Sequence, residues 1–171
     1  MFEKRISGMF LGEIFRQTLL SLMSSAGLFS GQSSKPLSIQ YGIDTSAMSD
    51  IAADVSPHYS GVAGTIASHF QIPHSTPDDR RTVKIISDAI VRRSARLAAV
   101  AISAVCDFSG KFAKASVENP VDIGADGSLV EFYPNYVDMC LEACEEILGN
   151  NARRTIRIGL AKDGSGVGAA L

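Results

Sequence analysis

The sequence lacks a strong excess of charge of either sign. Its 171 residues carry 16 Lys and Arg against 18 Asp and Glu, which gives a formal net charge of −2. Proteins that grip nucleic acid through its phosphates usually show a clear basic excess. The balance therefore argues against a nucleic-acid partner.

Long apolar runs are also missing. The longest uninterrupted stretch of apolar and small residues is 97–106, whereas a membrane-spanning helix needs roughly 18 or more. The opening segment, MFEKRISGMF, places acidic and basic side chains before a short, broken apolar stretch. A secretory signal peptide has a different pattern. We therefore expect no membrane span and a cytoplasmic globular protein.

Cysteine is scarce, with three residues at Cys106, Cys140 and Cys144. An odd number does not build a disulfide framework. Cys140 and Cys144 stand four residues apart and would share one helix face, so a metal pair is conceivable. The histidines lie in distant, polar segments, and free cysteine usually behaves as a small core residue. Three core cysteines and no metal site are therefore expected.

Two long helices are indicated by apolar residues at helical spacing. The first runs from about residue 10 to residue 24 and stops at Gly27. The second has Thr76 as its N-cap, followed by proline and two aspartates, and continues to Val105. Residues 97–105 are apolar nearly all round and should be buried on most sides. The expected apolar stripe of this helix comprises Val83, Ile86, Ile90, Leu97, Val100, Ala101 and Ala104.

Shorter elements separate these helices. Residues 30–42 are rich in serine, glycine and proline and are expected to form a loop. Asp44 or Thr45 is placed to cap a short helix that ends near Ala53, and residues 61–70 fit another.

After residue 116 the spacing of apolar residues changes, and the pattern becomes that of alternating strands and helices in an α/β arrangement. A strand is expected within 117–125, an extended segment over 129–133, a helix from Pro134 to about Leu148, and a second strand over 155–160. Strand, helix and strand in this order predict a parallel pair, with the helix from Thr76 packed across one face.

Asp-Gly-Ser follows both predicted strands, at residues 126–128 and 163–165. Open α/β sheets bind ligands at the carboxyl ends of their strands, and a glycine there allows the backbone to approach a ligand closely. Asp-Gly is also an ordinary turn dipeptide. The repeat is therefore consistent with a nucleotide site or with two plain turns at the same sheet edge.

Four separated segments together resemble the hexokinase family. Residues 2–13, FEKRISGMFLGE, are similar to its Phe-Glu-Lys-Met-x-Ser-Gly-x-Tyr-Leu-Gly-Glu signature, and residues 92–97 resemble its Arg-Ala-Ala-x-Leu helix. Residues 124–128 with Pro134 resemble the adenosine motif, and residues 163–170 match the C-terminal turn. The segments keep the family's order and spacing, so the chain is identified as a member of the eukaryotic, fungal-type hexokinases and glucokinases.

The resemblance implies a fold and a domain organisation. The fold is an α/β partial actin-like ATPase (ribonuclease H-like) domain, with long helices packed on a small parallel sheet. Residues 1–171 correspond to the C-terminal part of the large domain. The family's small domain, its N-terminal phosphate loop and the rest of the N-terminal half fall outside this chain.

The family's sugar ligand falls on Glu3. A carboxylate suits that role because it accepts charge-assisted hydrogen bonds from two adjacent hydroxyl groups. Taken alone, Glu3 would be read as a solvated charge near the start of the chain.

The resemblance also places a nucleotide-binding wall along three segments. Its residues are Gly8, Met9, Thr45, Ser46, Ala47, Met48, Ser49, Gly127, Ser128, Leu129, Val130, Glu131 and Phe132. Each segment has a plainer explanation, since Gly8 and Met9 suit a helix start, Thr45 suits an N-cap and Gly127 suits a turn.

The implied activity is ATP-dependent phosphorylation of a hexose such as glucose at its 6-hydroxyl, with Mg²⁺ held through ATP. Arg5 and Glu131 depart from the family pattern, and Glu131 stands where lysine is usual, which reverses a charge near a polyphosphate. A non-catalytic hexokinase-like regulator or sugar sensor is therefore an alternative. Another actin-like ATPase, such as a chaperone ATPase, ranks last because it lacks the Phe-Glu-Lys run.

Overall fold

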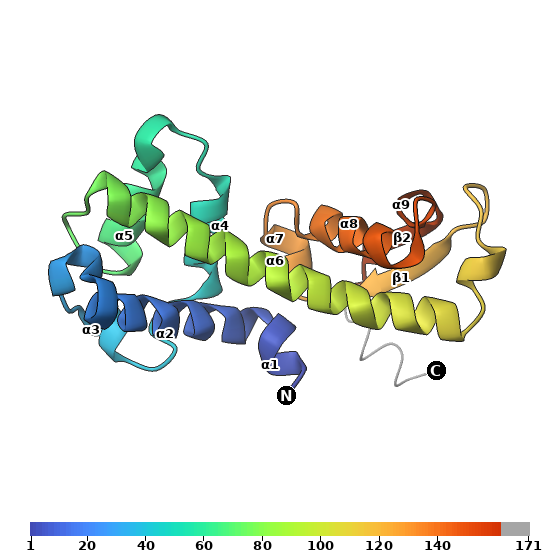
Figure 1. The fold of residues 1–171 in the computed structure, drawn as a ribbon, viewed down its shortest axis with the longest axis horizontal. Helices are drawn as coiled ribbons and strands as arrows, with labels where there is room; N and C mark the ends of the chain where they lie inside the picture. Colours follow the sequence, from blue (N-terminus) through green and yellow to red (C-terminus); the bar gives the residue numbers. More distant parts are fainter. Residues whose placement is uncertain (162–171) are drawn as a thin grey trace. The chain divides into compact units, whose positions relative to one another are not determined.

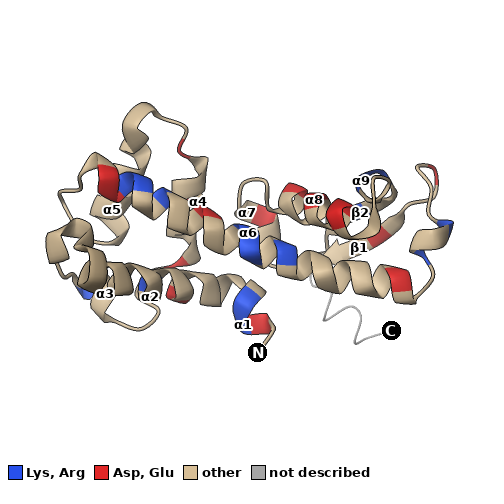
Figure 2. Cartoon of the chain, viewed as in Figure 1, with Lys and Arg blue, Asp and Glu red and all other residues tan. Residues whose placement is uncertain are grey.

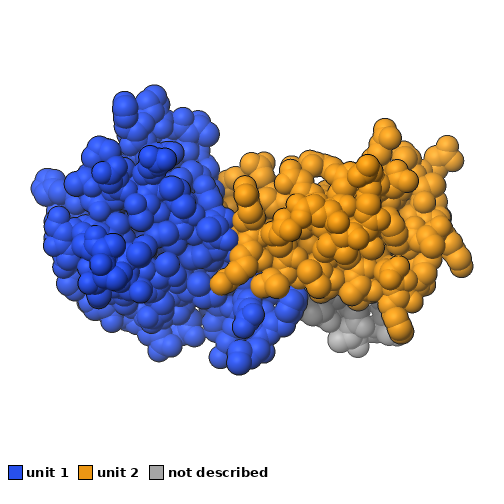
Figure 3. All heavy atoms as spheres, viewed as in Figure 1, with its two compact units in different colours: residues 1–91 blue, residues 92–171 orange. Residues whose placement is uncertain are grey.

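A computed structural model describes residues 1–161. The chain divides into two compact units, unit 1 from Met1 to Val91 and unit 2 from Arg92 onward (Figure 3). The long helix α6 (Pro77–Phe108) contributes to both units (Figure 1).

Unit 1 is built from helices around an aromatic and aliphatic core. Its other elements are α1 (Glu3–Ile6), α2 (Gly8–Ala26), η1 (Leu28–Gly31), α3 (Lys35–Ser38), α4 (Thr45–Ala53), η2 (Pro57–Tyr59) and α5 (Ser60–His69). Leu11, Phe15 and Leu19 recur along one face of α2 and are fully buried. Phe15 packs edge-on against Phe70, with ring centroids 5.9 Å apart. The predicted helix over 10–24 is thus confirmed, although α2 begins two residues earlier and ends two residues later.

The predicted helix ends in unit 1 are confirmed at two positions. Gly27 closes α2 in the left-handed conformation, at φ 69°, and its N–H donates to the carbonyl of Leu22. At the start of α6, the Thr76 hydroxyl accepts from the Asp79 N–H at 3.1 Å, and the Asp79 carboxylate accepts from the Thr76 N–H at 2.9 Å. This reciprocal capping box satisfies two backbone donors at the start of α6. The first turn of α6 carries acidic residues, which Figure 2 colours red.

The loop expected over 30–42 is more ordered than predicted, because α3 forms inside it. Ser34 caps this single turn by accepting from the Leu37 N–H at 3.4 Å, and the fully buried Leu37 anchors it. Of the two candidate caps for α4, Asp44 takes the position and accepts from the Ser46 N–H at 2.7 Å.

Unit 2 contains the parallel pair that the sequence predicts. Its elements after α6 are η3 (Phe112–Lys114), β1 (Val121–Ala125), α7 (Ser128–Phe132), α8 (Tyr136–Leu148), α9 (Ala152–Thr155) and β2 (Ile156–Leu160). The register pairs Val121 with Ile156 and Ala125 with Leu160, so both strands end at the same sheet edge. Asp126–Ser128 leave from that edge, whereas the predicted turn at 163–165 lies outside the described residues.

The segment between the strands corrects two expectations. Residues 129–133 were expected to be extended, but α7 is helical over Ser128–Phe132. The Gly127 carbonyl accepts from the N–H groups of Val130 and Glu131, at 3.1 and 3.2 Å, because the chain reverses at Gly127. Pro134 does not open the next helix, which starts at Tyr136 after a left-handed Asn135 at φ 60°.

The core of unit 2 joins the second half of α6 to α8 and the sheet. Its buried members are Ala99, Cys106, Ala143, Cys144, Ala152 and Ile156, with Ile102, Val121, Ile123 and Ile158 packed against them. All three cysteines are free and buried, as predicted. Burial raises the pKa of Cys140 to about 12. The hydroxyls of Ser94 and Tyr136 lie 2.9 Å apart and tie α6 to α8.

The buried face of α6 differs from the predicted stripe. Small and polar residues dominate it: Val83, Ser87, Ile90, Val91, Ser94, Ala95, Ala99, Ser103 and Cys106. Val100 and Val105 are instead 52% and 68% exposed, so the expectation that residues 97–105 are buried on most sides is wrong. Small side chains let α8 approach α6 closely, and the Cys144 thiol reaches the Ala99 carbonyl at 3.9 Å. How closely a neighbouring helix can approach, and not hydropathy alone, therefore determines which face of α6 is buried.

The exposed apolar side of α6 faces a hollow of about 410 Å³ beside β1. Its walls include Ala101, Ile102, Val105, Val121 and Ile123. Within residues 1–161, β1 pairs with β2 along one edge and has no second strand partner. An apolar hollow beside an unpaired strand edge is a surface at which chains aggregate.

We expect Val105→Glu to reduce the aggregation of the 171-residue chain and its binding of an environment-sensitive apolar dye. A charge in the hollow disfavours its burial against another apolar surface. Ile85→Glu is the matched control, because Ile85 is also exposed on α6 but does not line the hollow. Light scattering and dye fluorescence measure both effects. Equal changes in the two variants would contradict the prediction.

Candidate functional site

Two of the predicted nucleotide segments meet in unit 1 through the side chain of Thr45. The Thr45 hydroxyl donates to the carbonyl of Gly8 in the first turn of α2. The same oxygen accepts from the backbone N–H of Gly12, one turn further along, at 3.1 Å. Gly8 and Thr45 are 37 positions apart in the sequence, yet one side chain joins them.

This contact depends on the absence of a side chain at Gly12. A β-carbon placed there would lie 2.4 Å from the Ile43 carbonyl oxygen and 3.1 Å from the Thr45 nitrogen. Both are backbone atoms, which cannot rotate away as a side chain can. Segment 43–45 therefore runs directly against the surface of α2, and Gly12 allows that approach.

The remaining residues of the second segment divide between core and surface. The side chains of Ala47 and Met48 are fully buried in unit 1. Ser46 is exposed and Ser49 is half-buried, so their hydroxyls lie near the surface of α4. This alternation is what a helix with one buried face produces. Any contact of Ala47 or Met48 with a ligand would have to come from the backbone.

The predicted sugar ligand and the start of α2 are exposed. Glu3 lies in α1, and within residues 1–161 its carboxylate takes part in no hydrogen bond or ion pair. Met9, in the first turn of α2, is 65% exposed. The Ser7 side chain makes no capping hydrogen bond at this helix start. Lys4 is held over the ring of Phe10, 5.7 Å from its centroid.

The third predicted segment, Gly127 to Phe132, lies in unit 2 where β1 ends. Gly127 has φ 125° and ψ 157°, a conformation that side-chain-bearing residues rarely adopt. Leu129 is buried and anchors α7 in the core, whereas Phe132 is 67% exposed. Ser128 and Glu131 are exposed and Val130 is half-buried. The segment thus presents a hydroxyl, a carboxylate and an aromatic ring to solvent.

Over residues 1–161, no three His, Cys, Asp or Glu side chains come close enough to hold a metal ion. In the same range, no helix is both long and apolar enough to cross a bilayer.

Sequence reasoning assigned no role to three residues that build the site in unit 1. They are Gly12, Glu13 and Arg16, all on α2. Gly8 and Gly12 stand one helical turn apart within an otherwise helical pattern, and a glycine inside a helix often marks a close backbone approach. That signal was present at Gly12 but was not used. Nothing local to the sequence shows which segment approaches it.

Known proteins that resemble this chain are hexokinases and glucokinases. A family profile described as hexokinase matches residues 1–171. The glucokinase of Aspergillus niger is 41% identical over 183 residues, which cover all of this chain and 36% of that relative. Hexokinase-2 of Schizosaccharomyces pombe is 37% identical over 171 residues, again covering 36% of that relative. The chain therefore spans about a third of the length of these relatives.

A solved structure gives the same likeness. The hexokinase from Schistosoma mansoni complexed with glucose superposes with a TM-score of 0.80 at 26% identity. The match covers 99% of this chain and 36% of the other.

We expect Gly12→Ala to destabilise unit 1 although alanine normally favours a helix. The added methyl group would collide with the Ile43 carbonyl, and such overpacking typically costs about 1–3 kcal/mol. Gly64→Ala is the control, because Gly64 also lies within a helix but has open space around it. It should stabilise the chain by about 0.5–1 kcal/mol. Urea unfolding measures both changes, and a Gly12→Ala variant as stable as Gly64→Ala would refute the close approach.

Proposed function

The chain belongs to the hexokinase family, and from that premise we propose that it forms part of an enzyme that phosphorylates a hexose such as glucose at the 6-hydroxyl, with ATP as donor. The observation that carries the proposal is the hydrogen bonding of Thr45 to Gly8 and Gly12. It joins two segments that family resemblance assigns separately to the nucleotide. A surface made of two distant segments held together in this way is suited to bind one ligand.

The fold is that of the actin-like ATPases, of which this chain contains long helices and a two-stranded parallel sheet. We assign residues 1–171 to the C-terminal part of the large domain. The small domain, the phosphate loops and the catalytic aspartate would come from the remaining length that the relatives have. The hollow beside β1 and the unpaired strand edge support this division, since the additional segments would cover them.

Glu3 is proposed as a hexose ligand. Its carboxylate is exposed and unengaged among the described residues, so both oxygens are available to accept from adjacent sugar hydroxyls. Its place in a short helix directly before α2 brings it close in sequence to Gly8 and Met9. A donor site and an acceptor site that are neighbours are what direct phosphoryl transfer requires.

We propose that ATP contacts two segments of unit 1 and one segment of unit 2. In unit 1 these are the first turn of α2, with Gly8 and Met9, and the segment from Thr45 to Ser49. In unit 2, Gly127 allows close backbone approach, and the exposed ring of Phe132 offers an apolar contact to the base or ribose. The side chains of Ala47, Met48 and Leu129 are buried and would act by shaping these segments.

Mg²⁺ would neutralise the charge of the transferring phosphates and would be held by ATP itself. The contribution of this chain is positioning. Holding donor and acceptor in one geometry supplies most of the rate enhancement in reactions of this class. We further propose that the protein acts in the cytoplasm.

A non-catalytic regulator that binds sugar is the second candidate, favoured by Glu131. This carboxylate is exposed on α7, within the proposed nucleotide wall. A negative charge there repels the phosphates of ATP. The two candidates differ in turnover: the enzyme binds hexose and transfers phosphate, whereas the regulator only binds.

The experiment is a chimera in which residues 1–171 replace the matching 36% of the Aspergillus niger glucokinase. We expect glucose 6-phosphate formation with Mg-ATP on the order of 1–10³ s⁻¹. The 171-residue chain alone should show none, since we place the base and the phosphate loops in the remaining length of the relatives. Within the chimera, Glu3→Gln should weaken glucose binding by about 10- to 150-fold, because it removes a charged hydrogen-bond acceptor worth about 1.5–3 kcal/mol.

Titration calorimetry with glucose measures the change, and Glu118→Gln, another exposed carboxylate, is the matched control. An unchanged dissociation constant for Glu3→Gln would remove Glu3 from the site. A chimera that binds glucose without turnover would favour the regulator.

A further inference from the structure

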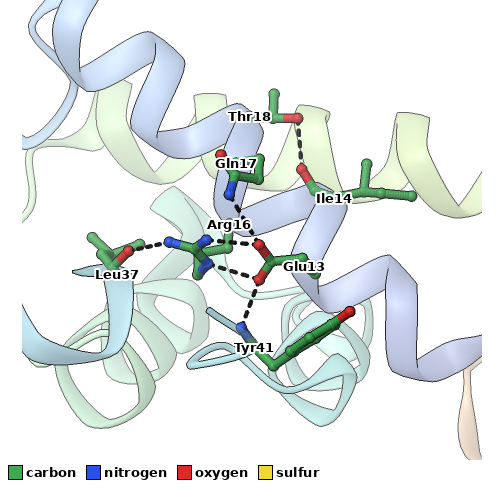
Figure 4. Close-up of polar contacts among 7 residues, drawn as sticks. All are labelled: Glu13, Ile14, Arg16, Gln17, Thr18, Leu37 and Tyr41. Atoms are coloured by element: carbon green, nitrogen blue, oxygen red, sulfur yellow. Dashed lines mark hydrogen bonds and ion pairs between the residues drawn. The ribbon is translucent and has the colours of Figure 1, made fainter. Parts of the chain in front are cut away.

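Arg16 and Glu13 form a largely buried ion pair on α2, the helix whose first turn belongs to the proposed nucleotide surface of unit 1. Arg16 is only 4% exposed, and its guanidinium grips the carboxylate of Glu13 with two parallel hydrogen bonds. Nε donates to Oε2 at 2.8 Å and Nη2 donates to Oε1 at 2.6 Å (Figure 4). The hydrogen bonds from Arg16 hold the pKa of Glu13 at about 2, so the carboxylate stays charged at physiological pH.

Both members of this pair also hold the backbone of segment 37–41, which runs from Leu37 in α3 into the turn that follows it. The third Arg16 nitrogen, Nη1, donates to the Leu37 carbonyl at 2.5 Å. The Glu13 carboxylate accepts from the backbone N–H of Tyr41 at 2.7 Å. The pair therefore fixes the turn at both ends, as Figure 4 shows. Tyr41 adopts φ 59°, unusual for a residue with a side chain, and its hydrogen bond to Glu13 stabilises that conformation.

Only three residues separate Tyr41 from Thr45, so the position of the turn determines the position of Thr45. Gly42 packs so tightly that a β-carbon on it would lie 2.1 Å from the Pro36 carbonyl oxygen. Ile43 is buried, and its carbonyl faces Gly12. The path from Tyr41 to Thr45 is thus short and closely packed at Gly42 and Ile43, so a shift of the turn would move Thr45.

We propose that Glu13 and Arg16 are positioning residues that hold the segment from Ile43 to Ser49 against the start of α2, and thereby set the KM for ATP. The inference rests on the proposed function. Arg16 is too deeply buried to reach a ligand, so it acts through the backbone that it holds. A buried ion pair elsewhere often serves only to maintain the fold. The test therefore has to distinguish a positioning role from a purely structural one.

The test uses the chimera described above, with Arg16→Lys and Glu13→Gln as single variants. Lysine keeps the positive charge but cannot serve both oxygens of Glu13 and the Leu37 carbonyl at once. We expect the KM for ATP to rise about tenfold, which corresponds to 1.4 kcal/mol. The KM for glucose and the kcat at saturating ATP should stay within about twofold, because the proposed role of both residues is confined to the segment that binds ATP.

Two controls separate positioning from stability. Gln17→Ala removes a hydrogen bond to the same carboxylate but no contact with the turn, and should leave the KM for ATP unchanged. Ile66→Val lowers stability through the core of α5, and should lower the melting temperature without raising that KM. If a single variant fails to fold, the double variant Glu13→Gln, Arg16→Met leaves no unpaired buried charge and should show the same rise in KM.

An unchanged KM for ATP in these variants would overturn the inference while leaving the proposed function intact. An equal rise in the Ile66→Val control would overturn it as well. A chimera that neither binds nor uses ATP would overturn the proposed function and this inference with it.

Discussion

The backbone contact between α2 and segment 43–45 is the constraint on which the candidate site in unit 1 depends. It requires glycine at position 12, because the Ile43 carbonyl occupies the place of a β-carbon. Only at this short distance can the Thr45 hydroxyl bond both Gly8 and Gly12. Glu13 and Arg16 hydrogen-bond the backbone at Tyr41 and Leu37, in the segment that leads to Thr45. The absence of a side chain at Gly12 thus permits the Thr45 contact, and we propose that the ion pair of Glu13 and Arg16 keeps it in place.

In unit 2, small side chains also let two elements pack closely, but there they leave larger apolar residues exposed on the surface. The face of α6 that packs in the core carries Ser94, Ala99 and Ser103. Larger residues such as Val105 are exposed instead. An isolated domain that exposes valine beside an unpaired strand edge is prone to associate. The same surface is expected where further segments of a longer enzyme pack, and the relatives have about three times the length of this chain.

Elements governed by local rules could be predicted from the sequence, whereas those governed by packing could not. The cap at Thr76, the stop at Gly27 and the parallel strands follow from residue type and spacing. The helical turn at Ser128–Phe132 was missed because its β-branched and aromatic residues also suit a strand, and the reversal at Gly127 decides between them. The buried face of α6 was misjudged because hydropathy does not measure how closely a neighbouring helix approaches. Family resemblance named Gly8 and Thr45, but their hydrogen bond is a tertiary contact that no local pattern contains.

The central proposal is that the segment around Thr45 in unit 1 and the segment around Gly127 in unit 2 each contact ATP in a hexose kinase. Photolabelling of the chimera with 8-azido-ATP in the presence of Mg²⁺, followed by peptide mapping, tests it most directly. The account predicts that labelled peptides contain residues 45–49 or 127–132, and that excess ATP prevents the labelling. Labelling that is confined to other segments of this chain and is equally blocked by ATP would contradict it.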